Sequence, residues 1–172
     1  MIRPEVMQRI LVDYELPGMG LHGLAHWGRV LETGLRLDGS TGADPAVVRL
    51  FAVFHDARRW NEHSDPGHGG RGAELAFEMR PLLDVSDAQL QLLAIACRHH
   101  TDGRTQGDPT VQTCWDADRL DLWRVGIEPL GTRLCTEAAR QESMLEWSRV
   151  RSESDLVPDC AREWSRWAAG GS

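Results

Sequence analysis

Lysine is absent from this 172-residue chain, and all 19 of its basic residues are arginine. The absence excludes a phosphate-binding loop built around a lysine, and it excludes catalysis through a Schiff base. Anionic groups of a ligand must therefore be met by guanidinium groups, by metal ions or by backbone amides. The net charge of −7 disfavours binding to a nucleic-acid polymer, and we expect no partner of that class.

Paired cysteines and long apolar runs are also missing. The four cysteines lie far apart without a C-x-x-C pair, which excludes zinc-ribbon and thioredoxin-like sites and predicts free thiols. No segment approaches the roughly 20 apolar residues of a membrane span, and the first residues do not resemble a secretory signal. We therefore expect a cytoplasmic protein that has no membrane partner.

The apolar residues recur at helical spacing almost throughout, and no segment alternates convincingly as a strand would. This pattern predicts an all-α fold, and the length fits a single domain over residues 1–172. The recognisable motifs lie within about 21–126. We expect a turn-rich loop over residues 61–70 and helices over about 110–124, 131–151 and 158–168. The part of the chain within 131–168 indicates no function.

Two helix starts are well supported by local chemistry. Asp44 followed by Pro45 combines an N-cap residue with a proline at the first helical position. Ser86 and Gln89 have the spacing of a capping box. We expect the apolar stripe of the helix that starts there to run through residues 92, 95 and 96 and to continue to His99.

The pair His55-Asp56 follows an apolar helical run and is the most informative feature of the chain. His26 lies one predicted helix earlier, and Asp118 lies further on, in the segment D-A-D-R-L-D. Buried imidazoles and carboxylates are costly unless something satisfies them. Two of each suit a divalent cation of intermediate hardness, which can activate water for hydrolysis.

The order of three motifs, H-x-x-x-H-x-x-R-V from residue 22, then H-D, then D-A-D-R-L-D, is similar to that of the HD-domain superfamily of metal-dependent phosphohydrolases. The resemblance implies an all-helical bundle with a central metal site. It implies His26, His55, Asp56 and Asp118 as ligands of one divalent cation: manganese, iron, nickel, zinc or magnesium. The implied substrate is a small phosphoester, such as a nucleotide or a phosphorylated metabolite.

Additional histidines follow the H-D motif. His68, His99 and His100 occupy places comparable to those that complete a second metal site in two-metal subgroups of this superfamily. With a single metal, they would instead bind phosphate or donate a proton, and His99 is our candidate for a catalytic role. Arg58 and Arg59 are candidates to neutralise phosphate oxygens, although both also suit a solvated helix end.

Some further residues are expected to support the metal ligands, and functions other than hydrolysis remain open. Arg29, Arg119 and Asp121 are expected to hold the ligands in place. Two alternatives to hydrolysis stay open: a non-catalytic sensor domain that binds metal or nucleotide, and a di-iron oxygenase of the same superfamily. Self-association into a homo-oligomer is compatible with the tryptophan-rich end of the chain.

Overall fold

Helices form all the regular secondary structure within residues 2–168, the part of the chain that the computed structural model describes. The predicted all-α class is therefore confirmed. The α-helices are α1 Pro4–Val12, α2 Leu24–Thr41, α3 Pro45–Phe54, α4 His68–Glu78, α5 Asp87–His99, α6 Pro109–Arg119, α7 Glu137–Arg140, α8 Glu142–Glu153 and α9 Asp159–Ala168. Short 3-10 turns are η1 Arg80–Leu82, η2 Leu122–Val125 and η3 Gly131–Arg133.

The two helix starts predicted from local chemistry are both confirmed. The Asp44 carboxylate accepts a hydrogen bond from the backbone N–H of Ala46 at 2.8 Å, and Pro45 begins α3. The Ser86 hydroxyl accepts from the N–H of Gln89, whose side chain accepts from the N–H of Ser86. These caps fix where α3 and α5 begin and hence which residues stand at their far ends.

Some boundaries differ from those expected. The chain does not continue as one helix over 110–124, because α6 ends at Arg119 and the following turn tightens into η2. The expected helix over 131–151 is interrupted at Gln141, whose extended backbone (φ −61°, ψ 134°) separates α7 from α8. Helix α4 begins at His68, within the segment that the turn-forming residues indicated as a loop.

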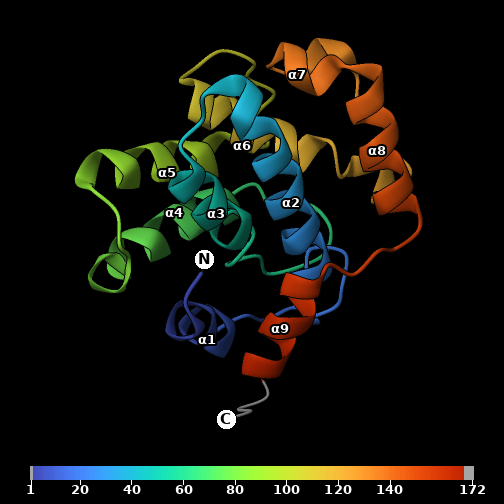
Figure 1. The fold of residues 1–172 in the computed structure, drawn as a ribbon. Coiled ribbons are helices and arrows are strands. Elements are labelled where there is room, and N and C mark those ends of the chain that lie inside the picture. The colour runs from blue at the N-terminus through green and yellow to red at the C-terminus, as the bar shows by residue number, and fades with distance from the viewer. Residues whose placement is uncertain (1, 169–172) are drawn as a thin grey trace.

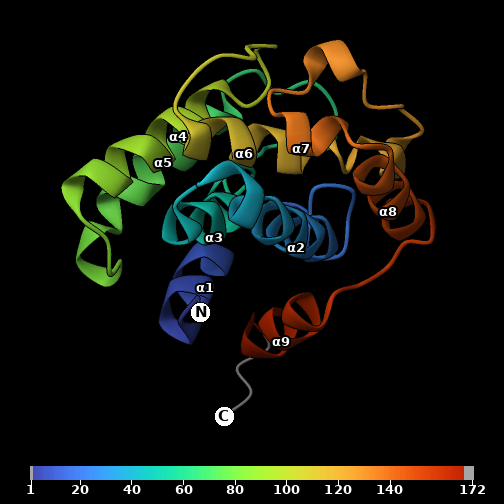
Figure 2. The same cartoon turned by 45° about the horizontal axis from the view of Figure 1, so that its top comes forward.

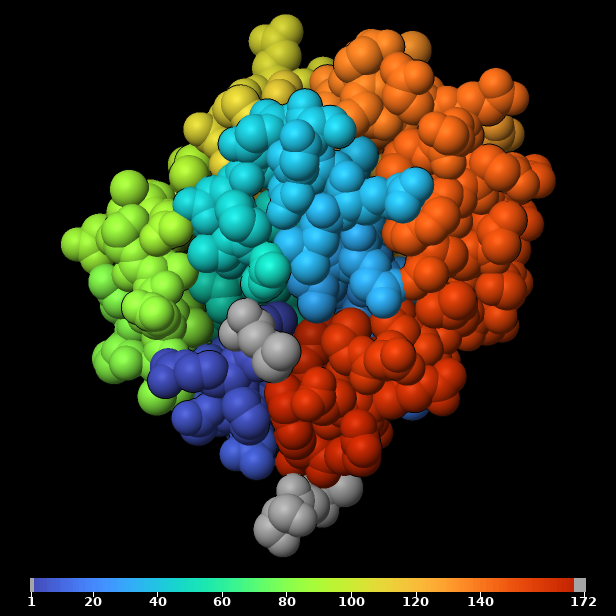
Figure 3. Space-filling model, viewed as in Figure 1, coloured from blue at the N-terminus to red at the C-terminus, as the bar shows by residue number. Residues whose placement is uncertain are grey.

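Helices α2, α3 and α6 lie together in the middle of the molecule, with the α4–α5 pair on one side and α8 on the other (Figures 1 and 2). Helix α9 packs against α1 and α2, and it lies beside them at the surface in Figure 3. Trp27, Phe51 and Trp115 are among the largest side chains of the core. The first helices and the last helix therefore pack around the same hydrophobic core.

Two glycines let α4 approach its neighbours closely. A Cβ added at Gly72 would lie 2.2 Å from the carbonyl oxygen of Phe54, and one added at Gly69 would lie 2.2 Å from that of Cys97. Both distances are far inside van der Waals contact, so only glycine fits this packing. The approach brings the start of α4 against the ends of α3 and α5.

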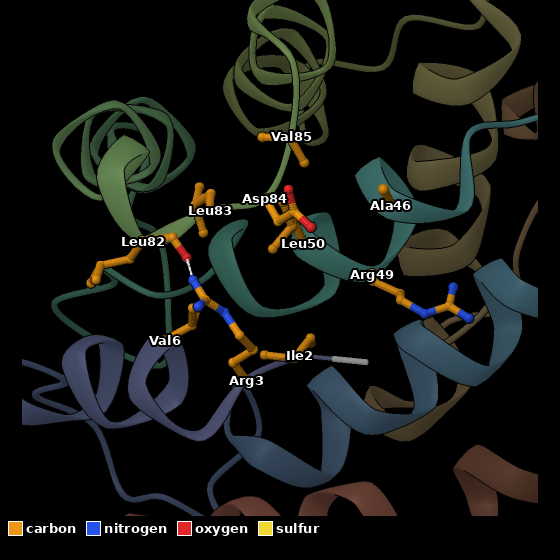
Figure 4. Close-up of a pocket in the computed structure, with 10 residues that line it drawn as sticks. All are labelled: Ile2, Arg3, Val6, Ala46, Arg49, Leu50, Leu82, Leu83, Asp84 and Val85. Carbon is orange, nitrogen blue, oxygen red and sulfur yellow. Dashed lines mark hydrogen bonds between the residues drawn. The ribbon is translucent and has the colours of Figure 1, made fainter.

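A cavity of about 230 Å³ lies between α1, α3 and the segment that links η1 to α5 (Figure 4). The Arg3 guanidinium crosses it and donates a hydrogen bond to the carbonyl of Leu82. No histidine lines this cavity. No helix within residues 2–168 is both long enough and apolar enough to cross a membrane.

Candidate metal centre

Three segments that are remote in sequence bring their side chains together at helix ends. His26 stands in the first turn of α2, His55 and Asp56 directly follow α3, and Asp118 stands in the last turn of α6. The Nε2 atom of His26 lies 3.1 Å from His55 Nε2, 3.6 Å from Asp56 Oδ2 and 3.4 Å from Asp118 Oδ1. Both histidines are completely buried. The structure therefore places all four predicted ligands in one cluster.

Hydrogen bonds fix the tautomers of the two histidines. His26 Nδ1 lies 2.7 Å from Asp121 Oδ2, and His55 Nδ1 lies 3.0 Å from the carbonyl oxygen of Phe51. A carboxylate and a carbonyl can only accept, so each Nδ1 carries the proton and each neutral ring leaves a bare lone pair on Nε2. Two acceptors then face each other at 3.1 Å, which is repulsive without a cation between them.

The spacing of these donors fits a single ion. Donor atoms that share a cation at bonds of about 2.1 Å lie roughly 3 to 3.5 Å from their neighbours. The distances of His55 Nε2 to Asp56 Oδ2 and to Asp118 Oδ1 are 3.6 and 3.8 Å, close to that spacing. Two neutral imidazoles and two carboxylates suit manganese, iron, nickel or zinc. His26, His55 and Asp118 together could hold a divalent metal ion, and Asp56 Oδ2 lies 3.6 Å from both imidazole Nε2 atoms.

A second group of the same kind lies on the other oxygen of Asp56. His68 Nε2 and His100 Nε2 are 2.9 Å apart, and they lie 3.1 and 3.8 Å from Asp56 Oδ1. Their Nδ1 atoms donate to backbone carbonyls, His100 to that of Cys97 at 2.7 Å, so both Nε2 atoms again face inward as acceptors. This second group could also hold a metal ion, and the Asp56 carboxylate faces both groups, one through each oxygen.

Arg59 lies beside the second group. Its Nη1 is 3.4 Å from Asp56 Oδ1 and 3.2 Å from His68 Nε2. Its Nε and Nη2 donate to the backbone carbonyls of Asn61 and His63. These two bonds hold the buried guanidinium at the edge of the cluster, on the side of His68.

Asp121 supports the first group from behind. Its carboxylate accepts from His26 Nδ1, from Arg29 Nε at 2.7 Å and from the Ser152 hydroxyl at 2.6 Å. Arg29 also donates to the carbonyl of Leu156. The expectation that Arg29 and Asp121 lie behind the ligands agrees with this geometry. Helix α8 and the turn after it thus reach the cluster through Asp121.

The cluster shifts the pKa values of its own members. Burial is the strongest influence on His55 and lowers its pKa to about 3, although the charges of Asp56 and Asp118 act in the opposite direction. Burial alone would raise the pKa of Asp56, but the surrounding imidazoles, His55 foremost, lower it well below its ordinary value. The site therefore keeps His55 neutral and Asp56 ionised, which are the forms that bind metal.

Three predicted site residues are placed elsewhere. His99 is one-third exposed and pairs with Asp102 at 2.9 Å, whereas its buried neighbour His100 joins the cluster. Arg58 turns toward α1, donating to the carbonyl of Ile10. Arg119 pairs with no carboxylate among residues 2–168, since its Nη1 donates to a backbone carbonyl and to a cysteine sulfur. The structure therefore does not bring these three side chains together with the four predicted ligands.

One residue at the cluster was not assigned to the site from the sequence. His22 Nδ1 lies 2.8 Å from Asp56 Oδ2, and its side chain is 15 % exposed. The four-residue spacing from His26 was a signal, but a helical pair requires a helix at both residues. Helix α2 begins only at Leu24, so His22 reaches Asp56 from the preceding loop.

The lowered pKa of His55 predicts an acid-sensitive stability of chelator-treated protein. Below about pH 6.5 the unfolded chain protonates this histidine while the folded chain does not. The free energy of unfolding should therefore fall by about 1.4 kcal/mol per pH unit between pH 6 and 4.5. Urea titrations at several pH values measure this slope. His55→Gln should flatten it and the exposed His63→Gln should not; equal slopes in both variants would contradict the assignment.

Comparison with known proteins connects this geometry to a family. No protein-family model matches the sequence, and no curated protein matches it. Among solved structures, the fold is similar to that of a predicted HD superfamily hydrolase from an uncultured Thermotogales bacterium, with a TM-score of 0.63 and 26 % identity. The similarity covers 94 % of this chain and 90 % of that chain. That fold, with the histidine–aspartate motifs brought together at its centre, confirms the predicted resemblance of the chain to the HD-domain superfamily.

Proposed function

We propose that this protein is a metal-dependent phosphohydrolase that acts on a small phosphoester, such as a nucleotide or a phosphorylated metabolite. One observation carries the proposal: each oxygen of the Asp56 carboxylate faces its own pair of bare imidazole nitrogens. Two cations sharing one carboxylate form a site that is common among enzymes that hydrolyse phosphoesters. The similar Thermotogales protein is itself described as a predicted hydrolase.

The residues divide into ligands and groups that meet the substrate. His26, His55, Asp56 and Asp118 would hold the first cation, and Asp56, His68 and His100 the second. Bound cations would polarise a phosphoryl oxygen and lower the pKa of a coordinated water toward neutrality. The chain itself contributes a fixed array of lone pairs, because every ligating imidazole is held by a hydrogen bond that its Nδ1 donates.

Arg59 is the candidate for stabilising charge on the phosphoryl group. Phosphoryl transfer develops charge on oxygens that a guanidinium can neutralise, and a group already in place acts without reorganisation. The two backbone carbonyls that hold Arg59 leave Nη1 next to Asp56 Oδ1. In the proposed mechanism, Arg59 binds a phosphate oxygen there and stays in position throughout the reaction.

The adjacent histidines of α5 provide a sharp test. We expect the protein, loaded with manganese or iron, to release inorganic phosphate from members of a panel of nucleotides and sugar phosphates. His100→Gln should lower the metal content by about one ion per chain and lower the rate at least about 10-fold. His99→Gln, one residue away and outside the cluster, is the matched control and should change neither quantity by more than about twofold.

The outcomes separate the competing functions. Metal analysis and phosphate release are measured on the same preparations, together with oxygen consumption by the iron-loaded protein. Equal effects of the two substitutions would contradict the second metal site. Absence of phosphate release with manganese, iron, nickel, zinc and magnesium would contradict hydrolysis. Oxygen consumption without phosphate release would favour an oxygenase instead.

A further inference from the structure

A pocket of about 390 Å³ adjoins the metal centre and is not explained by metal binding. His100 and Asp118 line both the cluster and this pocket, so a phosphoryl group at the metals would have the rest of its molecule in the pocket. The volume is within the range of small-molecule sites, whereas a polymer would need an extended groove. The residues that line the pocket therefore indicate which chemical groups the substrate carries.

One buried cation in these walls has no counter-charge. Arg119 lines the pocket and is 7 % exposed. Its Nη1 donates to the carbonyl of Arg133 at 2.6 Å and to the sulfur of Cys135 at 3.3 Å. Its Nη2 is buried and has no hydrogen-bond partner in the described part of the chain. No carboxylate within residues 2–168 lies within ion-pairing distance of it. A buried charge normally has an ionic partner, so a ligand that completes this site should be anionic.

A second guanidinium stands at the exposed side of the same pocket. A Cβ added at Gly103 would lie 2.7 Å from Arg133 Nη1, so this side chain lies against the loop that follows α5. Arg133 likewise has no ion pair among the described residues. The exposed Glu128 is the carboxylate that this pocket has in addition to Asp118. Two unpaired arginines in a chain with a net charge of −7 mark an anion-binding position.

The remaining wall is apolar. Ile127 and Leu130 are 52 % and 61 % exposed, and with Leu122 and Pro129 they face the pocket from the segment after α6. Exposed apolar side chains that gather around a concave site are suited to cover a carbon skeleton or a ring. The pocket thus combines an apolar wall with cationic groups separate from the metal ligands.

We propose that the substrate is an organic phosphate that carries a second oxyanion, a phosphate or a carboxylate, and that Arg119 and Arg133 bind this second group. The apolar wall would hold the skeleton that joins the two anionic groups. The inference rests on the proposed function, because it places the first phosphate at the metals. Arg119 is then a residue that determines specificity and takes no part in bond cleavage.

Two pairs of ligands that differ in the second oxyanion test the proposal by calorimetry on the manganese-loaded full chain. The pairs are adenosine 5′-monophosphate with adenosine 3′,5′-bisphosphate, and glycerol 3-phosphate with 3-phosphoglycerate. In at least one pair, the member with the second oxyanion should bind about 10-fold or more tightly than the member without it. A preference in the adenosine pair would identify the second group as a phosphate, and a preference in the glycerol pair would identify it as a carboxylate. Arg119→Gln should weaken that member about 10- to 100-fold and leave the other within about twofold.

The controls keep the outcome decisive. Arg162 lies on α9, is largely exposed and does not line the pocket. Arg162→Gln should therefore leave all affinities unchanged. Should Arg119→Gln lower the melting temperature enough to prevent measurement, Arg133→Gln replaces it, with an expected 3- to 10-fold effect on the same member. Equal affinities within both pairs would overturn the inference. So would a preference for the second oxyanion that is unchanged in the arginine variant that was measured. Because binding is the readout, failure to release phosphate would overturn only the proposed function.

Discussion

Replacing Asp56 with asparagine is expected to remove both metal ions and to lower the rate of phosphate release by about 1,000-fold or more. The physical reason is the shared carboxylate, whose Oδ2 faces His26 and His55 and whose Oδ1 faces His68 and His100. An amide has one neutral oxygen and one NH2 group, so it loses the negative charge and presents a donor instead of a ligand to one of the two imidazole pairs. Elemental analysis and initial rates measure the two effects.

A buried carboxylate elsewhere gives the matched control. Asp116, two residues before Asp118, accepts from the backbone N–H groups of Cys135 and Thr136 at 2.6 and 2.8 Å and is absent from the metal-binding groups. Asp116→Asn should therefore retain its metal, whatever it loses in stability. Normal metal content in Asp56→Asn, or equal metal loss in both variants, would refute the shared-ligand arrangement.

Asp121→Ala is expected to lower the free energy of unfolding by about 3–5 kcal/mol, a large share of the usual total. Burial by itself would raise the pKa of Asp121, but hydrogen bonds from His26 and Arg29 and the charge of Arg124 lower it to about 2. The alanine variant leaves the Arg29 guanidinium buried without its counter-charge. It also removes the acceptor that fixes the tautomer of His26, so metal affinity should fall about 10- to 100-fold.

Denaturant titrations with and without metal measure both effects of that change. Asp121→Asn preserves the shape and one acceptor oxygen, and it should lose less stability than the alanine variant. Because the pKa of Asp121 is lowered, its contribution is present above about pH 4 and is lost as the pH falls toward 2. The difference between the wild type and Asp121→Ala should therefore shrink at low pH. If the difference in the free energy of unfolding did not change with pH, or were below about 1 kcal/mol at neutral pH, Asp121 would not support the cluster as described.

The clustering of the four ligands could be predicted from the sequence because it depends on residue types and their order. Imidazoles and carboxylates at the ends of apolar helices are costly unless they share a purpose, and that argument needs no coordinates. His26, His55, Asp56 and Asp118 do lie together. The resemblance to two-metal members of the superfamily indicated His68, whose position at the start of α4 was not predicted, since the glycines around it resemble a loop.

His99 lies outside the cluster because the buried face of α5 differs from the one expected. The expected stripe through Leu92 and Ile95 leads to His99, but Ile95 is 43 % exposed. The buried face runs through Leu90, Leu93 and Cys97, which at steps of three and four leads to His100. On a helix that is buried over a wide arc, an error of one residue turns the predicted buried face by about 100° around the helix axis.

Arg119 could not be assigned from the sequence for a different reason. Its surroundings are made by Arg133 and Cys135, from a turn 14 and 16 residues later that follows no helical period. Its place beside Asp118 suggested that it holds carboxylates, and only the coordinates show that its neighbours are a carbonyl and a thiol. The proposal of a second oxyanion in the substrate depends on that difference.

The bond from Ser152 to Asp121, together with that from Arg29 to Leu156, gives the final quarter of the chain a part in chemistry whose motifs all lie earlier. That region has no recognisable signature, yet it presents a hydroxyl to Asp121 and a carbonyl to Arg29. Evolution could thus tune the strength of metal binding from a distance, through the helices that brace the carboxylate, without altering a single ligand.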